Sequence, residues 1–284
     1  MSYAAVTPGA AVQRRTWLTI EFLLLSLGAV VLLLPYVWML STSVKSPDDT
    51  FRVPLTLLPD VFRWDNYPRA LTHFAFGQYI FNSFFVASIV TASNVLFSSM
   101  AAYALTRFRF RGRDLVFLLI LSTLMLPPEV VLVPQFLVVR ALGWLNTYQG
   151  LIVPAALDAF GIFLMRQFML GFPGEIIEAA RVDGAGDFRI FARIVLPNMT
   201  PALATLAVFS FRDSWDQFIW PLAIISRDWM KTFPLGVAAY ESEAAGVFNE
   251  QMAVAVVGMI PMVLLFLLAQ KAFVQGISFS GLKG

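Results

Sequence analysis

Long runs of apolar residues separated by shorter polar segments are the dominant pattern of this chain. A helix needs about 20 predominantly apolar residues to cross the hydrocarbon core of a bilayer. Six stretches meet this need and predict transmembrane helices at about residues 17–39, 79–105, 115–139, 151–169, 201–225 and 252–269. The first is longer than the apolar region of a signal peptide, and no small-residue cleavage site follows it, so we expect it to stay as an anchor. The expected fold class is an all-α membrane protein.

Composition agrees with the apolar pattern and excludes several classes of function. Hydrophobic residues make up 58% of the 284 residues and charged residues only 13%, whereas an ordinary soluble domain carries roughly 25% charge. The chain has no cysteine and one histidine, His73, which excludes disulfides, a thiol nucleophile and a histidine metal cluster. The net charge is only +2, with dispersed Arg and Lys, so nucleic acid is not expected as a partner. We expect no catalytic site and no metal site.

The distribution of arginine and lysine predicts which segments face the cytoplasm. Positive charge accumulates in cytoplasmic loops, and here it is densest at Arg107–Arg113, between the second and third predicted spans. With a cytoplasmic N-terminus, the inner segments carry more Arg and Lys than the outer ones, so both termini are expected inside. The chain then divides into a cytoplasmic segment at 1–16, a membrane domain at 17–273 and a cytoplasmic tail at 274–284.

The inner loop at residues 170–200 carries the most informative polar pattern. A Pro-Gly pair breaks the preceding span, and a short helix is expected to follow it and to end at Gly184. A second helix is expected to stop at Pro197. Two physical interpretations are open. The loop is either a compact knob, whose Ala179 and Ala180 let a partner's backbone approach, or an amphipathic linker on the membrane surface.

The spacing within this loop resembles the EAA motif of ABC importer permeases. The pattern is Glu178-Ala179-Ala180, three residues, Gly184, nine residues, then Ile194-x-Leu196-Pro197. Flanking stretches such as Leu126-Pro127-Pro128 and Trp215–Pro221 look like the carbohydrate-uptake branch of that family. In that branch the chain is similar to the smaller permease subunit of maltose-type transporters, from about Trp17 onward.

The resemblance implies a fold, partners and a location. The fold is that of the type I ABC importer permeases, in the inner membrane of a bacterium and surrounded by lipid. The implied partners are a second permease subunit, two ATP-binding cassette subunits that hold ATP and Mg, and an extracytoplasmic solute-binding protein. The loop would form a coupling helix seated in the ATPase. The residues carried over for this coupling are Glu178, Ala179, Ala180, Asp183, Gly184, Leu196 and Pro197. The tail around Gly276–Gly284 looks like the family tail that reaches the ATPase interface.

The expected function is that of a permease subunit forming half of the pathway for a sugar or oligosaccharide. The chain has no G-x-x-x-x-G-K-[ST] phosphate loop, so we expect no ATPase activity and no cofactor bound by the chain itself. Permeases for glycerol-3-phosphate or another polyol resemble the same branch, and a gradient-driven secondary transporter is a further alternative. An embedded hydrolase is disfavoured because Gly276–Ser280 fails the G-x-S-x-G pattern.

Polar residues within the predicted spans are candidates for the solute path, because ionisable groups at membrane depth either pair or mark a pathway. The candidates are Asn82, Asn94, Glu129, Asp158, Asp213, Asp216 and Gln217. In the fifth span, Arg212 and Asp216 stand four residues apart, so the alternative there is a self-neutralised structural pair. Similar permeases usually show Asn where this chain has Asp216.

The other polar candidates also have structural alternatives. Glu129 follows two prolines where the third span is expected to be interrupted, and it either lines an interior path or marks the outer end of a helix. Asp158, Asn82 and Asn94 could instead join neighbouring helices by hydrogen bonds.

Overall fold

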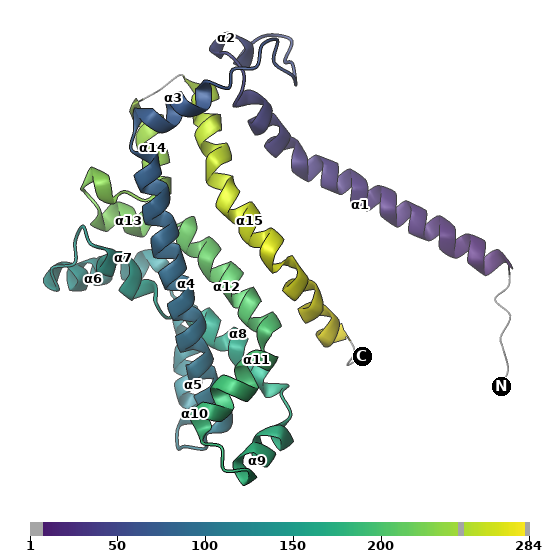
Figure 1. Cartoon of the computed structure of the whole chain (residues 1–284), viewed down its shortest axis with the longest axis vertical. Coiled ribbons are helices and arrows are strands. Elements are labelled where there is room, and N and C mark those ends of the chain that lie inside the picture. Colours follow the sequence, from purple (N-terminus) through teal and green to yellow (C-terminus); the bar gives the residue numbers. More distant parts are fainter. Residues whose placement is uncertain (1–7, 244–246, 282–284) are drawn as a thin grey trace. The chain divides into compact units, whose positions relative to one another are not determined.

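The computed structural model describes residues 8–243 and 247–281, and every regular element within those ranges is a helix (Figure 1). The predicted all-α fold class is therefore confirmed. The chain separates into two compact units, one formed by residues 1–70 and 245–256 and the other by residues 71–244 and 257–284. The ends of the predicted terminal segments, 1–7 and 282–284, lie outside the described residues.

The first unit contains α1 (Pro8–Thr42), α2 (Pro47–Thr50) and the beginnings of α3 (Asn66–His73) and α15 (Phe248–Gly281). The apolar side chains of α1 from Trp17 onward are almost all exposed, as suits a helix that contacts lipid. The segment after α1 is fixed by polar contacts. Lys45 is fully buried, donates to the carbonyl of Thr56 and lies 4.5 Å from the centre of the Trp38 ring.

The long helix α4 (Phe76–Arg107) is the centre of the second unit. It packs along α12 (Thr200–Trp215) and α8 (Ala159–Leu170) (Figure 1). Small residues on α4 make the close approach possible, since Ala87, Ser98 and Ala102 are fully buried there. Gly161 on α8 lies close against α4, because a Cβ added to it would lie 2.6 Å from the Ser98 hydroxyl oxygen.

This close contact gives a stability prediction. Gly161→Ala is expected to lower the thermal unfolding midpoint of the purified protein, at a cost of about 1–3 kcal/mol for overpacking. The matched control is Gly28→Ala, where the added methyl group meets nothing within 4 Å. A helical Gly→Ala change in open space is neutral or stabilising by up to about 1 kcal/mol. Equal midpoints for the two variants would contradict the contact between α8 and α4.

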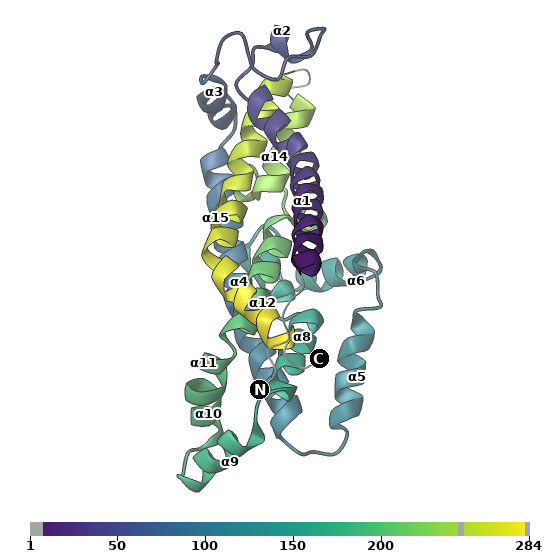
Figure 2. The same cartoon turned by 90° about the vertical axis from the view of Figure 1, so that its right-hand side faces the viewer.

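The third predicted span is interrupted where its two prolines stand. The helices α5 (Arg113–Thr123) and α6 (Pro128–Ala141) meet at an angle of 99° (Figure 2). Proline has no N–H to donate and clashes with the preceding turn, so Pro127 and Pro128 end one helix and begin the next. The expected interruption of the third span is confirmed.

The fourth predicted span is also broken. It consists of α7 (Tyr148–Ile152), a 3₁₀ turn, η1 (Val153–Ala155), and α8. Asp158 stands between the two parts with extended backbone, and its carboxylate accepts from the Gly161 N–H at 3.2 Å. Asp158 is thus the N-cap of α8, and its extended backbone separates α8 from the turn before it.

The fifth span departs most from the sequence prediction, because a continuous helix over 201–225 is wrong. α12 stops at Trp215, and a separate helix α13 (Ile219–Ile224) follows. In an uninterrupted helix the ring of Pro221 would clash with the carbonyl of Gln217. The chain breaks just before that point.

The helical segment before α12 consists of three parts. It runs through α10 (Asp187–Ile190), a π turn, η2 (Phe191–Val195), and α11 (Leu196–Asn198), and meets α12 at 81°. The helix ends at Asn198, one residue after Pro197, close to the stop that the sequence predicts. The π turn supplies a wider register, with the Leu196 N–H directed to the Phe191 carbonyl, and the helix continues past the proline to Asn198.

Within residues 8–243 and 247–281, four helical segments are long and apolar enough to cross a membrane, and the number rises to six if each bent pair counts as one span. The four candidate spans are Trp17–Thr42, Phe76–Arg107, Phe248–Gln270 and Tyr148–Leu170, the last made up of α7, η1 and α8. Phe248–Gln270 agrees with the predicted sixth span. Among the described residues, the short helices α2, α3, η3 (Asp228–Met230) and α14 (Phe233–Glu243) were not predicted.

Candidate functional site

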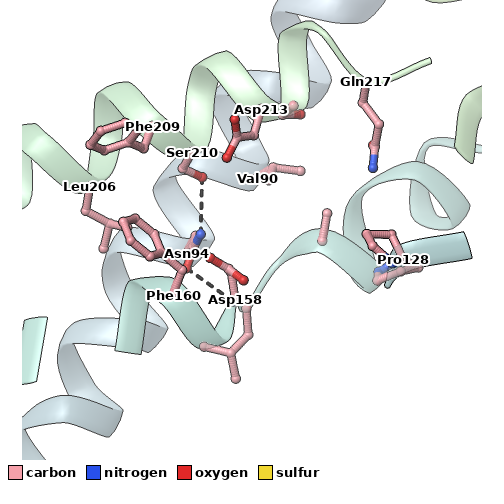
Figure 3. A pocket seen from close by; sticks show the side chains of 14 residues that line it. Val90, Asn94, Pro128, Asp158, Phe160, Leu206, Phe209, Ser210, Asp213 and Gln217 are labelled. Carbon is pink, nitrogen blue, oxygen red and sulfur yellow. Dashed lines mark hydrogen bonds between the residues drawn. The ribbon is translucent and has the colours of Figure 1, made fainter. Parts of the chain in front are cut away.

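A cavity of about 440 Å³ lies in the second unit where its helices are interrupted (Figure 3). Pro128 at the start of α6, Pro154 in η1, Asp158 at the start of α8 and Gln217 after the end of α12 all line it. Irregular backbone at membrane depth is tolerated only against protein or a water-filled cavity. The breaks in these three spans therefore converge on one place in the fold.

Polar side chains from three helices meet in this cavity. Its polar lining consists of Asn94, Asp158, Ser210, Asp213, Ser214 and Gln217. Figure 3 shows Ser210 and Asp213 on α12 across from Asp158 at the start of α8. Apolar side chains complete the wall, and the rings of Phe160 and Phe209 contact each other edge to face at 5.7 Å.

Asn94 is the polar centre that holds the three helices together. It is only 3% exposed. Its side-chain oxygen accepts from the Ser98 hydroxyl at 2.6 Å and from the Asp158 backbone N–H at 3.3 Å. Its amide nitrogen donates to the Ser210 hydroxyl oxygen at 3.3 Å. Asn94 thus joins helices and lines the cavity at once, so both sequence interpretations describe part of its environment.

The charged residues of α12 form a shared ion pair. Nη1 of Arg212 lies 3.6 Å from Asp213, and Nε of Arg212 lies 3.6 Å from Asp216. The expected pair between Arg212 and Asp216 is present, but the guanidinium also serves Asp213. The Arg212 side chain is 59% exposed, and neither Arg212 nor Asp216 is part of the cavity lining.

Asn82 is not part of the cavity lining, and both polar atoms of its side chain are hydrogen-bonded within the protein. Its side-chain oxygen accepts from Gln78 at 2.9 Å and from the Tyr148 hydroxyl at 2.7 Å. Its amide nitrogen donates to the carbonyls of Trp229 and Lys231, both at 2.9 Å. These contacts join α4 to α7 and to the segment around η3.

Asp228 lies in the segment around η3, and one of its two partners, Tyr79, is far away in the sequence. Its carboxylate lies 2.8 Å from Lys231 Nζ and accepts from the Tyr79 hydroxyl at 2.8 Å. The Lys231 and Tyr79 hydrogen bonds hold the pKa of Asp228 below its usual range.

Glu129 lines a second, neighbouring cavity of about 760 Å³ that shares Pro128, Asp158 and Gln217 with the first. Of the predicted path residues, the structure therefore brings Asn94, Asp158, Asp213 and Gln217 to the first cavity and Glu129 to the second. It leaves Asn82 and Asp216 outside both linings. The sequence analysis missed Ser210 and Ser214. Their signal was the helical spacing of Ser210, Ser214 and Gln217, three to four residues apart on one face.

The loop that resembles the EAA motif forms an ordered helix and turn. The helix α9 (Gly174–Val182) ends at Asp183, and Gly184 adopts a left-handed φ of 80°. The Ala185 N–H donates to the Ala180 carbonyl at 2.9 Å, and the Gly184 N–H donates to the Arg181 carbonyl at 3.0 Å. These bonds form a Schellman motif, in which glycine is favoured at the left-handed position, so the predicted helix end is confirmed.

Fewer residues of α9 are exposed to a partner than its sequence suggests. Glu178, Ala179, Asp183 and Gly184 are exposed, whereas Ala180 is buried together with Ile177 in the core beneath the helix. Only one of the two adjacent alanines is open to a partner. Leu196 and Pro197 lie in α11, after the turn, with Leu196 half-buried and Pro197 exposed.

An ion pair between exposed side chains on either side of Gly184 stabilises the turn after α9. Arg181 Nη2 lies 2.8 Å from the Asp187 carboxylate. This hydrogen bond raises the pKa of Arg181 above its ordinary value, so Arg181 stays charged. In both overall views, α9 and α14 lie at opposite ends of the second unit (Figures 1 and 2).

Interrupted membrane-length helices around a polar cavity, with an exposed helix on a rigid turn at one end, define a membrane transport protein. Residues 94–279 match the family described as the binding-protein-dependent transport system inner membrane component. The chain belongs to this family. It is thus an inner-membrane subunit of an import system that also contains a further permease subunit, an ATPase and a binding protein, and it is a transport subunit and not an enzyme.

Several relatives match nearly the whole chain. The arabinooligosaccharides transport system permease protein AraQ of Halalkalibacterium halodurans is 33% identical, over 95% of this chain and 97% of that protein. The sn-glycerol-3-phosphate transport system permease protein UgpE of Yersinia enterocolitica is 39% identical, over 89% and 93%. A crystal structure of a bacterial ABC transporter for the acidic polysaccharide alginate aligns with a TM-score of 0.80 and 26% identity, over 96% and 99%. The predicted family and permease fold are confirmed.

Proposed function

We propose that this chain forms half of the translocation pathway of an ATP-driven importer for a sugar or oligosaccharide. In this proposal the cavity around Asn94 is part of the solute path and α9 is the contact with the ATPase subunit. ATP and Mg bind to the partner ATPase subunits and not to this chain, and both termini and α9 lie on the cytoplasmic side.

The observation that carries the proposal is the course of α8. Its first turn is capped by Asp158 in the wall of the cavity, and its last residue, Leu170, is followed within four residues by α9. One short helix therefore connects the proposed ATPase contact directly to the proposed solute path. Movement of α9 is transmitted to the cavity with little intervening flexible chain.

A polyol phosphate is the second candidate solute. It is favoured by the 39% identity to a permease named for sn-glycerol-3-phosphate transport. The oligosaccharide candidate is supported by the 33% identical relative named for arabinooligosaccharides and by the neutral hydroxyl and amide groups of the cavity wall.

Reconstituted uptake tests the proposed function. The chain is assembled with the second permease, ATPase and binding protein of its own system in proteoliposomes, and uptake of labelled neutral oligosaccharides and glycerol-3-phosphate is measured. We expect uptake that needs ATP and the binding protein and that persists when ionophores collapse proton and sodium gradients. Uptake that follows either gradient without the ATPase subunits would show a secondary transporter instead.

A further inference from the structure

The charge of the cavity wall is one-sided. Asp158 and Asp213 line the first cavity, and Asp158 and Glu129 line the second. Among the described residues, neither lining contains an Arg, Lys or His. The relatives above are named for solutes that differ in charge, so membership of the family does not fix the charge of the solute. The charge of the cavity wall gives independent information about it.

The nearest guanidinium does not cancel this negative charge. Arg212 lies outside the lining and is shared between Asp213 and Asp216, at 3.6 Å from each. One positive charge therefore stands against two carboxylates, one on α12 and one at its C-cap. The other carboxylate of the first cavity, Asp158, makes no ion pair among the described residues and accepts a hydrogen bond from the N–H of Gly161 at the start of α8.

The wall also contains groups suited to a neutral, hydroxyl-rich solute. Ser210 is 7% exposed and its oxygen accepts from Asn94. Among the described residues its own hydroxyl proton has no acceptor, so it can donate to a solute in the cavity. Ionised carboxylates accept hydrogen bonds only, and they pair with sugar hydroxyls but repel phosphate and carboxylate groups. Asp158 and Asp213 face each other across the space such a solute would occupy (Figure 3).

We propose that Asp158 and Asp213 make this cavity a charge filter that admits neutral polyhydroxylated solutes and rejects anions such as phosphate monoesters and uronates. The inference rests on the proposed function of the cavity as part of the solute path. It predicts a solute preference different from the solutes for which the glycerol-3-phosphate relative and the alginate transporter are named.

The test measures the potential in the cavity without needing the natural solute. The chain contains no cysteine, so Ser214→Cys places a single thiol in the wall. The assembled complex is treated with a cationic trimethylammonium methanethiosulfonate and with an anionic sulfonate one, and modification of this chain is followed by its mass. We expect the ratio of cationic to anionic rates to exceed that of a free thiol by roughly tenfold or more.

The negative charges of the two aspartates are then removed by substitutions that preserve the fold. In the Ser214→Cys background, Asp158→Asn keeps an N-cap side chain and Asp213→Asn keeps the shape, and together they are expected to return the ratio to within a fewfold of the free thiol. Each single variant is expected to give an intermediate ratio, which provides a result if the double variant fails to assemble. Asp114→Asn is the matched control, since Asp114 is exposed on α5 and outside the cavity lining.

A free-thiol ratio in the Ser214→Cys protein, or a ratio that the Asp158 and Asp213 variants do not change, would overturn the charge filter. These outcomes are independent of transport. A complex with the expected ratio but no ATP-driven uptake would refute the proposed function alone. ATP-driven uptake of glycerol-3-phosphate at the same rate as a neutral oligosaccharide would refute the charge filter alone.

Discussion

A Gly184→Pro variant of the assembled importer is expected to lose ATP-driven uptake completely while its membrane helices still insert. Proline fixes φ near −65° and has no N–H, whereas Gly184 has a φ of 80° and donates to the Arg181 carbonyl. The Schellman turn after α9 cannot form with proline, so Asp183 and the exposed end of α9 leave their positions. The measurement is solute uptake and ATP hydrolysis in proteoliposomes, with membrane insertion followed by complex purification.

The matched control is the same substitution two residues further along. Gly186 has a φ of −72°, within the range of proline, and its N–H makes no backbone hydrogen bond among the described residues. Gly186→Pro is therefore expected to preserve uptake. Glu178→Lys reverses an exposed charge without disturbing the turn and is expected to abolish uptake as well. If uptake survived Gly184→Pro, α9 would not be the contact with the ATPase.

The positions of the membrane helices were predictable because the bilayer imposes a length and a composition on each of them. The predicted end of α9 was equally accessible, since a left-handed residue after a helix strongly favours glycine, here Gly184. The interruption at Pro127 and Pro128 followed from the chemistry of proline. The break after Trp215 has the same cause, because Pro221 does not fit an uninterrupted helix. Pro221 stands within an apolar run at 218–225, so the sequence analysis took it as part of one continuous span.

The candidate site was predictable only in part. The rule that polar groups at membrane depth are costly selected Asn94, Asp158 and Asp213, and the fold brings these together. The same rule selected Asn82, which the fold satisfies with the Trp229 and Lys231 carbonyls, 147 and 149 residues away in the chain. Local pattern does not encode such distant partners. It also does not separate a polar side chain that lines a cavity from one whose hydrogen bonds are complete.

Arg107→Gln is expected to uncouple ATP hydrolysis from transport. Arg107 Nη2 donates to the carbonyls of Met169 and Phe172, both at 2.8 Å, and the guanidinium lies 5.8 Å from the centre of the Phe172 ring. It therefore binds the end of α4 to the end of α8, where carbonyls lack helical partners. Hydrogen bonds to a charged group contribute about 1.5–3 kcal/mol, so this joint is among the strongest near α9.

The other end of α8 is held to α4 by the Asp158 N–H, which donates to Asn94. With both ends fixed, a displacement of α9 moves α8 and α4 together and changes the cavity between them. Without Arg107, α9 moves while the cavity stays still, so ATP hydrolysis is expected to continue while solute uptake per ATP falls about tenfold, as for a coupling of 1.4 kcal/mol.

Two further substitutions separate this coupling role from a general effect of charge. Arg107→Lys provides a point charge without the planar fork of arginine and is expected to give an intermediate ratio of uptake to hydrolysis. Arg111→Gln removes an exposed arginine of the same loop and is expected to leave the ratio unchanged. If uptake and hydrolysis fall in parallel in Arg107→Gln, the residue only supports assembly. A fall in uptake alone is the result that makes α8 the mechanical link between α9 and the cavity.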